Sequence, residues 1–271
     1  MAESVRLTAE RIMALPTAKN DTRAITRGIL EAMSIANFYE CDAISDAVDQ
    51  MFEVMFDGKD ASELKLDQDC RLPSEVCGFW SKGTKVVANG HPDPLPMMYL
   101  AVQDKGRVFV YLVSPYMSPL STGNYIVGPE GGVFVDLYGN DEDAVRRVTQ
   151  TLTVAAVCSV INQPGFTKVE TTGSRQERRA ATRSGGYAPD AWHRITWNIG
   201  EEVKAKLTRD EPVRCMPLHY TRGHWRKAQP EWNGATKRKD GAYYQWIDGY
   251  WSGHPAFGIR KAYHAPVAAA S

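Results

Sequence analysis

The chain has 271 residues, of which 43% are hydrophobic and 24% are charged, and its 32 basic side chains balance its 32 acidic ones. These values are ordinary for a soluble globular protein, and the length allows one large domain or two modest ones. The sequence argues against a membrane protein, because the longest apolar stretch, residues 152–161, is too short to span a bilayer. It also argues against a disulfide scaffold, because the five cysteines form no CxxC pair; we expect free thiols and a cytoplasmic location.

Residues 7–56 predict helices. Thr8 is suited to cap a first helix, Asp21 or Thr22 a second, and Asp42 a third. After the last two of these positions, apolar residues recur at helical spacing, so each helix has one face for a core.

Residues 76–138 change to a hydrophobic period of two. This pattern predicts strands at residues 86–87, 97–102, 107–113 and 132–137, with a tight turn at Asp104-Lys105-Gly106. Because the connections are short, we expect an antiparallel sheet. Residues 142–162 then predict a long helix whose apolar second half is buried against that sheet.

Residues 165–190 are rich in arginine and glycine and predict a flexible basic linker or a long exposed loop; the alternative is a segment that contacts phosphates. Strand-like alternation follows at residues 193–199, 213–226 and 243–247, with a short helix or turn near 201–207. We therefore expect an α+β fold in three parts. Helices on an antiparallel sheet form an acidic domain over residues 1–164, the linker covers 165–190, and a small basic, aromatic, β-rich module covers 191–271.

The charge is divided unequally between the two halves of the chain. Residues 1–164 hold 14 basic and 22 acidic residues, a net charge of −8, whereas residues 165–271 hold 18 and 10, a net charge of +8. Five of the six histidines and six of the seven tryptophans also lie in the second part. A basic surface interleaved with aromatic rings suits a polyanion whose bases can stack.

The densest group of such residues is HYTRGHWRK at 219–227. On a strand, Arg222, His224 and Arg226 share one face, and a bulge or turn at Gly223 would bring His219 to them. The group can bind phosphates, or it can cleave RNA without a metal. In the second case a neutral His219 or His224 accepts the 2′-hydroxyl proton and Arg222 stabilises the charge on the phosphorane. A purely structural role is the third interpretation.

A second aromatic patch covers residues 246–264. Its rings form either a stacking platform for bases, with Tyr250 and Trp251 as the candidate rings, or the core of a small β module. In the second interpretation the exposed residues include Arg260 and Lys261.

Cofactor and metal signatures are weak. Cys215, His219 and His224 have the spacing C-x3-H-x4-H, but a fourth zinc ligand is not evident, and we expect neither a metal nor a cofactor. The GxGxxG, P-loop and GxSxG motifs are absent from the sequence, which argues against nucleotide hydrolysis and serine hydrolase chemistry.

The words RGHWR at 222–226, Trp246-Ile247 and GHPAFGIR at 253–260 resemble those of a group of uncharacterised phage and prophage proteins, which have an RGHWR-like strand or a GHWRGDPALGIK-like tail. The resemblance covers roughly the last 80 residues, in short words only. It implies a viral or mobile-element origin and no particular activity. The arginine and aspartate of the GHWRGDP pattern are replaced in this chain, which reads GYWSGHP at 249–255.

The leading hypothesis is a phage-type protein of the host cytoplasm that binds RNA or DNA through its C-terminal module. Phosphates are then contacted by Arg222, Arg226, Lys227, Arg260 and Lys261, and bases stack on Trp225, Tyr250 or Trp251. One alternative is a metal-independent endoribonuclease that uses His219, His224 and Arg222. The other is a protein–protein role, as an inhibitor of a host factor or a virion component, and the opposite charges of the halves also permit self-association.

Overall fold

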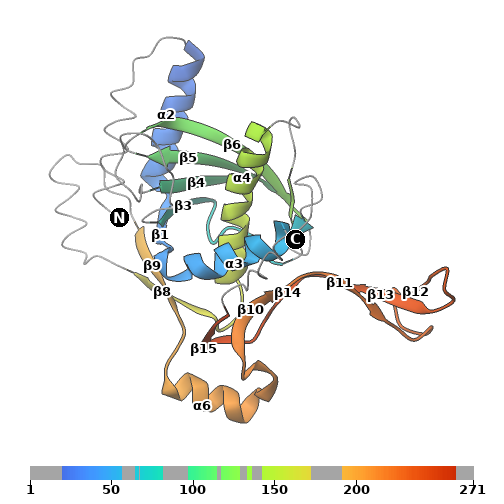
Figure 1. Cartoon of the computed structure of the whole chain (residues 1–271). Helices are drawn as coiled ribbons and strands as arrows, with labels where there is room; N and C mark the ends of the chain where they lie inside the picture. Colours follow the sequence, from blue (N-terminus) through green and yellow to red (C-terminus); the bar gives the residue numbers. More distant parts are fainter. Residues whose placement is uncertain are drawn as a thin grey trace, which may run out of the picture.

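The computed structural model describes residues 20–56, 65–66, 68–81, 97–114, 117–128, 133–135, 142–171 and 191–260. In these residues helices pack on a large sheet, and two small sheets follow towards the C-terminal end (Figure 1). The predicted α+β class is confirmed. The expected helix at Thr8, the strand at 86–87 and most of the basic segment at 165–190 lie outside the described residues.

A nine-stranded sheet is the largest element of the described chain, with the order β2-β7-β6-β5-β4-β3-β1-β9-β8. The strands at 97–102 and 107–113, and the turn between them, were predicted correctly. Lys105 and Gly106 both have positive φ, +48° and +79°, as a two-residue hairpin turn between right-twisted strands requires. The strand bounds in this sheet are β1 Asn37–Glu40, β2 Lys65–Leu66, β3 Val76–Ser81, β4 Met97–Asp104, β5 Arg107–Ser114, β6 Met117–Val127, β7 Val133–Val135, β8 Thr167–Thr171 and β9 Ala191–Trp197.

The sheet is mixed, which corrects the expectation of an antiparallel one. β1 runs parallel to β3 on one side and to β9 on the other, and the other neighbouring pairs are antiparallel. The reason is the connection from β1 to β3, which contains a helix. Such a crossover returns the chain in the same direction, whereas a short hairpin reverses it.

The helices cover both faces of this sheet. On one face, α2 buries Ile29 and Met33 against sheet residues that include Phe38 and Trp80. On the other face, α3 and α4 bury Met51 and Leu152 in a larger core. The helical elements are α2 Asn20–Ile35, η1 Asp42–Ile44, α3 Ser45–Phe56, α4 Glu142–Ile161, α6 Glu201–Asp210 and η3 Pro212–Arg214. Every helix of the described chain is too short or too polar to cross a lipid bilayer.

The second half of α4 is apolar on nearly all sides because the fold covers it from several directions. The sheet lies on one side, and Ser159 on the helix contacts both the Met51 sulfur of α3, at 3.6 Å, and the Trp251 indole Nε1, at 3.4 Å. Trp251 belongs to a small sheet of order β14-β10-β15, formed by Tyr250–Ser252, Pro217–Thr221 and His254–Ile259. The C-terminal residues therefore complete the core of the N-terminal part.

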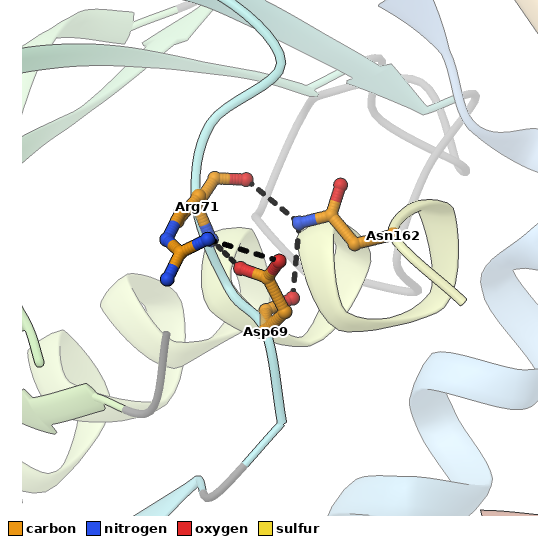
Figure 2. A network of polar contacts seen from close by, with 3 residues as sticks. All are labelled: Asp69, Arg71 and Asn162. Carbon is orange, nitrogen blue, oxygen red and sulfur yellow. Dashed lines mark hydrogen bonds and ion pairs between the residues drawn. The ribbon is translucent and has the colours of Figure 1, made fainter. Parts of the chain in front are cut away.

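A polar network fixes residues 68–72 to the end of α4 (Figure 2). The Asn162 side-chain amide donates to the backbone carbonyls of Asp69, at 3.0 Å, and Arg71, at 2.9 Å. The Asp69 carboxylate accepts the Arg71 backbone N–H at 3.1 Å. These bonds hold Gln68, the neighbouring residue, at a fixed position beside the C-terminal sheets.

The large sheet takes in a strand that the sequence assigned to the C-terminal module. β9 pairs with β1 through Asn37–Ala191 to Glu40–Arg194, and β8 pairs with β9 at the edge. After Trp197 the chain leaves the large sheet and enters α6 and then the two small sheets. The C-terminal part that lies outside the large sheet therefore begins near residue 198.

Candidate nucleic-acid interface

Residues 222–249 form a projecting element that we call the arm. It contains the three-stranded antiparallel sheet β11-β13-β12, formed by His224–Lys227, Tyr243–Ile247 and Thr236–Lys237. In Figure 1 this sheet extends away from the rest of the molecule. None of its residues belongs to either hydrophobic core, and every residue of β11 and β12 is exposed. A sheet of this kind adds no core to the described chain and presents both faces to solvent.

Two glycines allow close packing at the root of the arm, where the chain enters it at Gly223 and leaves it at Gly249. A Cβ at Gly223 would lie 2.6 Å from the Trp246 ring, and a Cβ at Gly249 would lie 2.3 Å from the Tyr220 hydroxyl. Gln68 completes the root: its side-chain amide donates to the Gly249 carbonyl, and its Oε1 accepts the Tyr220 hydroxyl at 3.3 Å. Close packing and a buried amide therefore tie the root to the network of Figure 2.

The pairing register sorts the side chains of the arm onto two faces. Trp225 lies opposite Trp246, and the two indoles meet edge to face at 5.3 Å. The Arg238 guanidinium lies over Trp225 at 4.2 Å and over Tyr244 at 5.3 Å. We call Trp225, Tyr244 and Trp246, with Arg238 between the first two, the ring face.

The opposite face carries His224, Arg226 and Lys237. The Arg226 guanidinium lies over the Trp232 ring at 4.9 Å and is 3.5 Å from Gln245 Oε1. Cation–π contacts of this kind orient a guanidinium while its N–H groups remain directed at solvent. Both faces of the arm therefore combine cations with indole rings.

Of the predicted catalytic residues His219, His224 and Arg222, only His224 lies in the arm sheet. It shares a face of β11 with Arg226, as the alternation predicted, but Arg222 precedes the strand and His219 lies in β10, in a different sheet. Each histidine has its Nδ1 at a local carbonyl, His219 at Pro217 (2.9 Å) and His224 at Arg222 (3.1 Å). In each neutral ring Nδ1 then carries the proton and Nε2 is the basic nitrogen.

Two candidates from the second aromatic patch have different surroundings. Tyr250 is exposed at the base of the arm, but Trp251 is only 8% exposed, in the core beside α4. The prediction that Trp251 stacks on bases is therefore wrong: its ring contacts Tyr220 edge to face at 5.3 Å, and its N–H points to Ser159. Arg260 is exposed after β15, and Lys261 lies outside the described residues.

Four residues of the connection from β11 to β13 were missed as candidates: Trp232, Lys237, Arg238 and Lys239. All four are exposed. The signal was present in the sequence, because residues 232–244 alternate between basic and aromatic clusters. The RGHWR motif at 222–226 covers only the first strand of this three-stranded sheet.

His254 is a structural histidine. Its Nε2 lies 2.9 Å from the Gly165 carbonyl, its Nδ1 accepts the Ala256 backbone N–H at 3.1 Å, and its ring packs edge to face on Phe166. Both nitrogens are satisfied only in the neutral form that carries its proton on Nε2. Burial lowers the pKa of His254 from its usual value, and the nearby Arg214 lowers it further.

This lowered pKa gives the fold a pH dependence with a definite sign. The unfolded chain binds a proton at His254 below about pH 6.5, whereas the folded chain resists protonation. The free energy of unfolding is therefore expected to decrease as the pH falls from 7.5 through the lowered pKa. Urea unfolding at several pH values should show a smaller decrease in a His254→Gln variant, and parallel curves for the two proteins would contradict this assignment.

Four of the five cysteines are buried, and Cys215 is partly exposed. Cys41, Cys70, Cys77 and Cys158 are buried in the larger core. Burial raises the pKa of the Cys41, Cys77 and Cys158 thiols, so they stay protonated and unreactive. Within the described residues, no group of three or more His, Cys, Asp or Glu side chains is arranged to hold a metal ion.

Comparisons with known proteins found no homologue of this chain. No family model matches the chain, and neither the curated proteins nor the solved structures contain a significant match to it.

Proposed function

We propose that the protein binds nucleic acid, RNA or DNA, through the arm. The observation that carries this proposal is a solvent-exposed sheet that contributes nothing to the cores and yet holds cations and large rings on both faces. Residues 222–248 contain six Lys and Arg against three Asp and Glu, so the arm has a positive charge that attracts phosphates. An origin in a phage or mobile element, acting in the host cytoplasm, is part of the same proposal and rests on the sequence resemblance.

The residues expected to contact phosphates lie on the arm and beside it. Arg226 and Arg238 are held by rings, and Lys227, Lys237 and Lys239 are exposed along the strands and the turn. Arg222 precedes the first strand of the arm. Arg260 is also expected to contact phosphates. It is an exposed cation beside the root of the arm, and its backbone N–H donates to the Leu218 carbonyl at 2.9 Å.

Salt dependence tests the proposal directly. If three to five cations contact phosphates, the logarithm of the association constant for a single strand falls with the logarithm of salt concentration with a slope of about −2 to −4. Fluorescence anisotropy with a labelled oligonucleotide measures this slope. A slope near zero would rule out binding driven by phosphate contacts.

A matched pair of variants locates the contacts. Replacing Lys227, Lys237 and Lys239 with Gln is expected to reduce the slope by about 2 and to weaken binding on the order of 100-fold at 0.1 M salt, because three counterion-releasing contacts are lost. The control removes three exposed lysines elsewhere, as Lys105→Asn, Lys168→Gln and Lys206→Gln; asparagine tolerates the positive φ of residue 105. Equal losses in the two variants would place the binding surface outside the arm.

The binding assay also tests the alternative that the protein is a metal-independent ribonuclease. The exposed His224, with its basic Nε2 on the same face as Arg226, is the observation that favours it. Binding is therefore measured in EDTA, and the RNA is recovered and sized afterwards. Shortened strands that disappear with His224→Gln would support cleavage, whereas intact RNA at high protein concentration removes it.

A further inference from the structure

The exposed indoles of the ring face pack within the arm and on neither hydrophobic core. Trp225 is 46% exposed and Trp246 is 41% exposed. The two rings contact each other, and Trp225 also contacts Arg238, but neither ring belongs to a core. Apolar surface left in water forgoes about 25 cal/mol per Å² of burial energy. A partner that covers these rings would recover that energy.

Phosphate binding alone does not account for the rings. The phosphates of a duplex and those of a single strand attract the same lysines and arginines. The flat faces of bases, however, are accessible only where strands are unpaired, since a duplex stacks them on one another. Sheet surfaces that carry aromatic side chains beside cations bind bases in this way, and each stacked base contributes about 1–3 kcal/mol.

We propose that the ring face binds unpaired bases, so that the protein prefers single-stranded nucleic acid to duplex; this inference rests on the proposed function. Trp225 and Trp246 supply the stacking rings, and Arg238, already stacked on Trp225 and Tyr244, supplies a cation at the same face. Lys227, which lies opposite Tyr244 in the pairing register, adds a phosphate contact beside the rings. The positive charge of the arm complements the strand that carries the bases.

The test compares single-stranded and duplex probes of equal sequence and length, about 20 nucleotides, longer than the 4–16 nucleotides that a typical single-strand module covers. Native protein is expected to bind the single strand more tightly. Trp225→Ala is expected to weaken single-strand binding by about 5- to 150-fold more than it weakens duplex binding, because a base loses its stacking ring whereas the release of Arg238 from that ring affects both probes alike. Trp225→Phe retains a ring and is expected to keep most of the affinity. The measurements use both RNA and DNA strands of the same sequence. Trp225→Ala is expected to weaken the binding of whichever of these strands the native protein binds.

Trp232→Ala is the matched control, because Trp232 is 40% exposed but lies under Arg226, on the opposite face. Its loss is expected to alter single-strand and duplex affinity by the same factor. If native protein binds both probes equally, or if Trp225→Ala weakens both alike, base stacking is overturned while phosphate binding by the arm stands. If neither probe binds, the proposed function itself fails.

Discussion

Deleting residues 224–247 and joining Gly223 directly to Asp248 is expected to abolish nucleic-acid binding while the free energy of unfolding stays within about 1 kcal/mol of the native value. His224 pairs with Ile247 in the arm, so the two ends of the deletion already lie side by side. The shortened chain closes with a four-residue loop between Thr221 and Tyr250, which remain paired in the small sheet. Gln68 keeps its contacts with Tyr220 and Gly249.

Urea unfolding and fluorescence anisotropy measure the two effects on one preparation. Retained binding with the native salt slope would show that the arm is not the binding surface. A large loss of stability would instead show that the arm supports the core, against its absence from both hydrophobic clusters of the described chain.

Two tryptophans in similar short motifs are expected to lose very different amounts of stability when each is replaced by alanine. Trp251→Ala should lower the free energy of unfolding by about 3–5 kcal/mol, because the ring is buried against Tyr220 and α4 and its removal leaves a cavity. Trp225→Ala should cost less than about 1 kcal/mol, because the ring lies on the exposed arm. Urea unfolding of both variants measures the contrast, and similar losses would contradict this division of roles.

Those two residues also show where sequence reasoning reaches its limit. Both lie in short, aromatic, glycine-containing words, and nothing local distinguishes them. Trp251 is buried because it packs on residues that are distant in the sequence, such as Ser159 of α4, which is 92 residues away and accepts the indole N–H. A site prediction made from short sequence motifs alone therefore cannot separate exposed aromatic side chains from those buried in the core.

Elements fixed by local signals were predicted well. The β4–β5 hairpin follows from alternation around a Lys105-Gly106 turn, and α4 follows from its helical pattern and its apolar second half. β1 gave no comparable signal in the sequence. It has only four residues, and it forms a strand because it pairs with two parallel neighbours, β3 and β9, that are both distant in the sequence. In the arm, the strand at 243–247 was also predicted, but β12 was not. The pairing that places Trp246 opposite Trp225, with Arg238 beside that ring, depends on contacts that no single stretch of sequence encodes.

The position of β1 has a consequence for the order of synthesis. Its partner β3 is complete at Ser81, but its partner β9 ends at Trp197, and the contact between Glu40 and Arg194 spans 154 residues. At ribosomal rates of about 5–20 residues per second, one side of β1 stays unpaired in the nascent chain for on the order of ten seconds. An open strand edge of that lifetime is a template for aggregation, so newly made protein is most in need of chaperone protection in this interval.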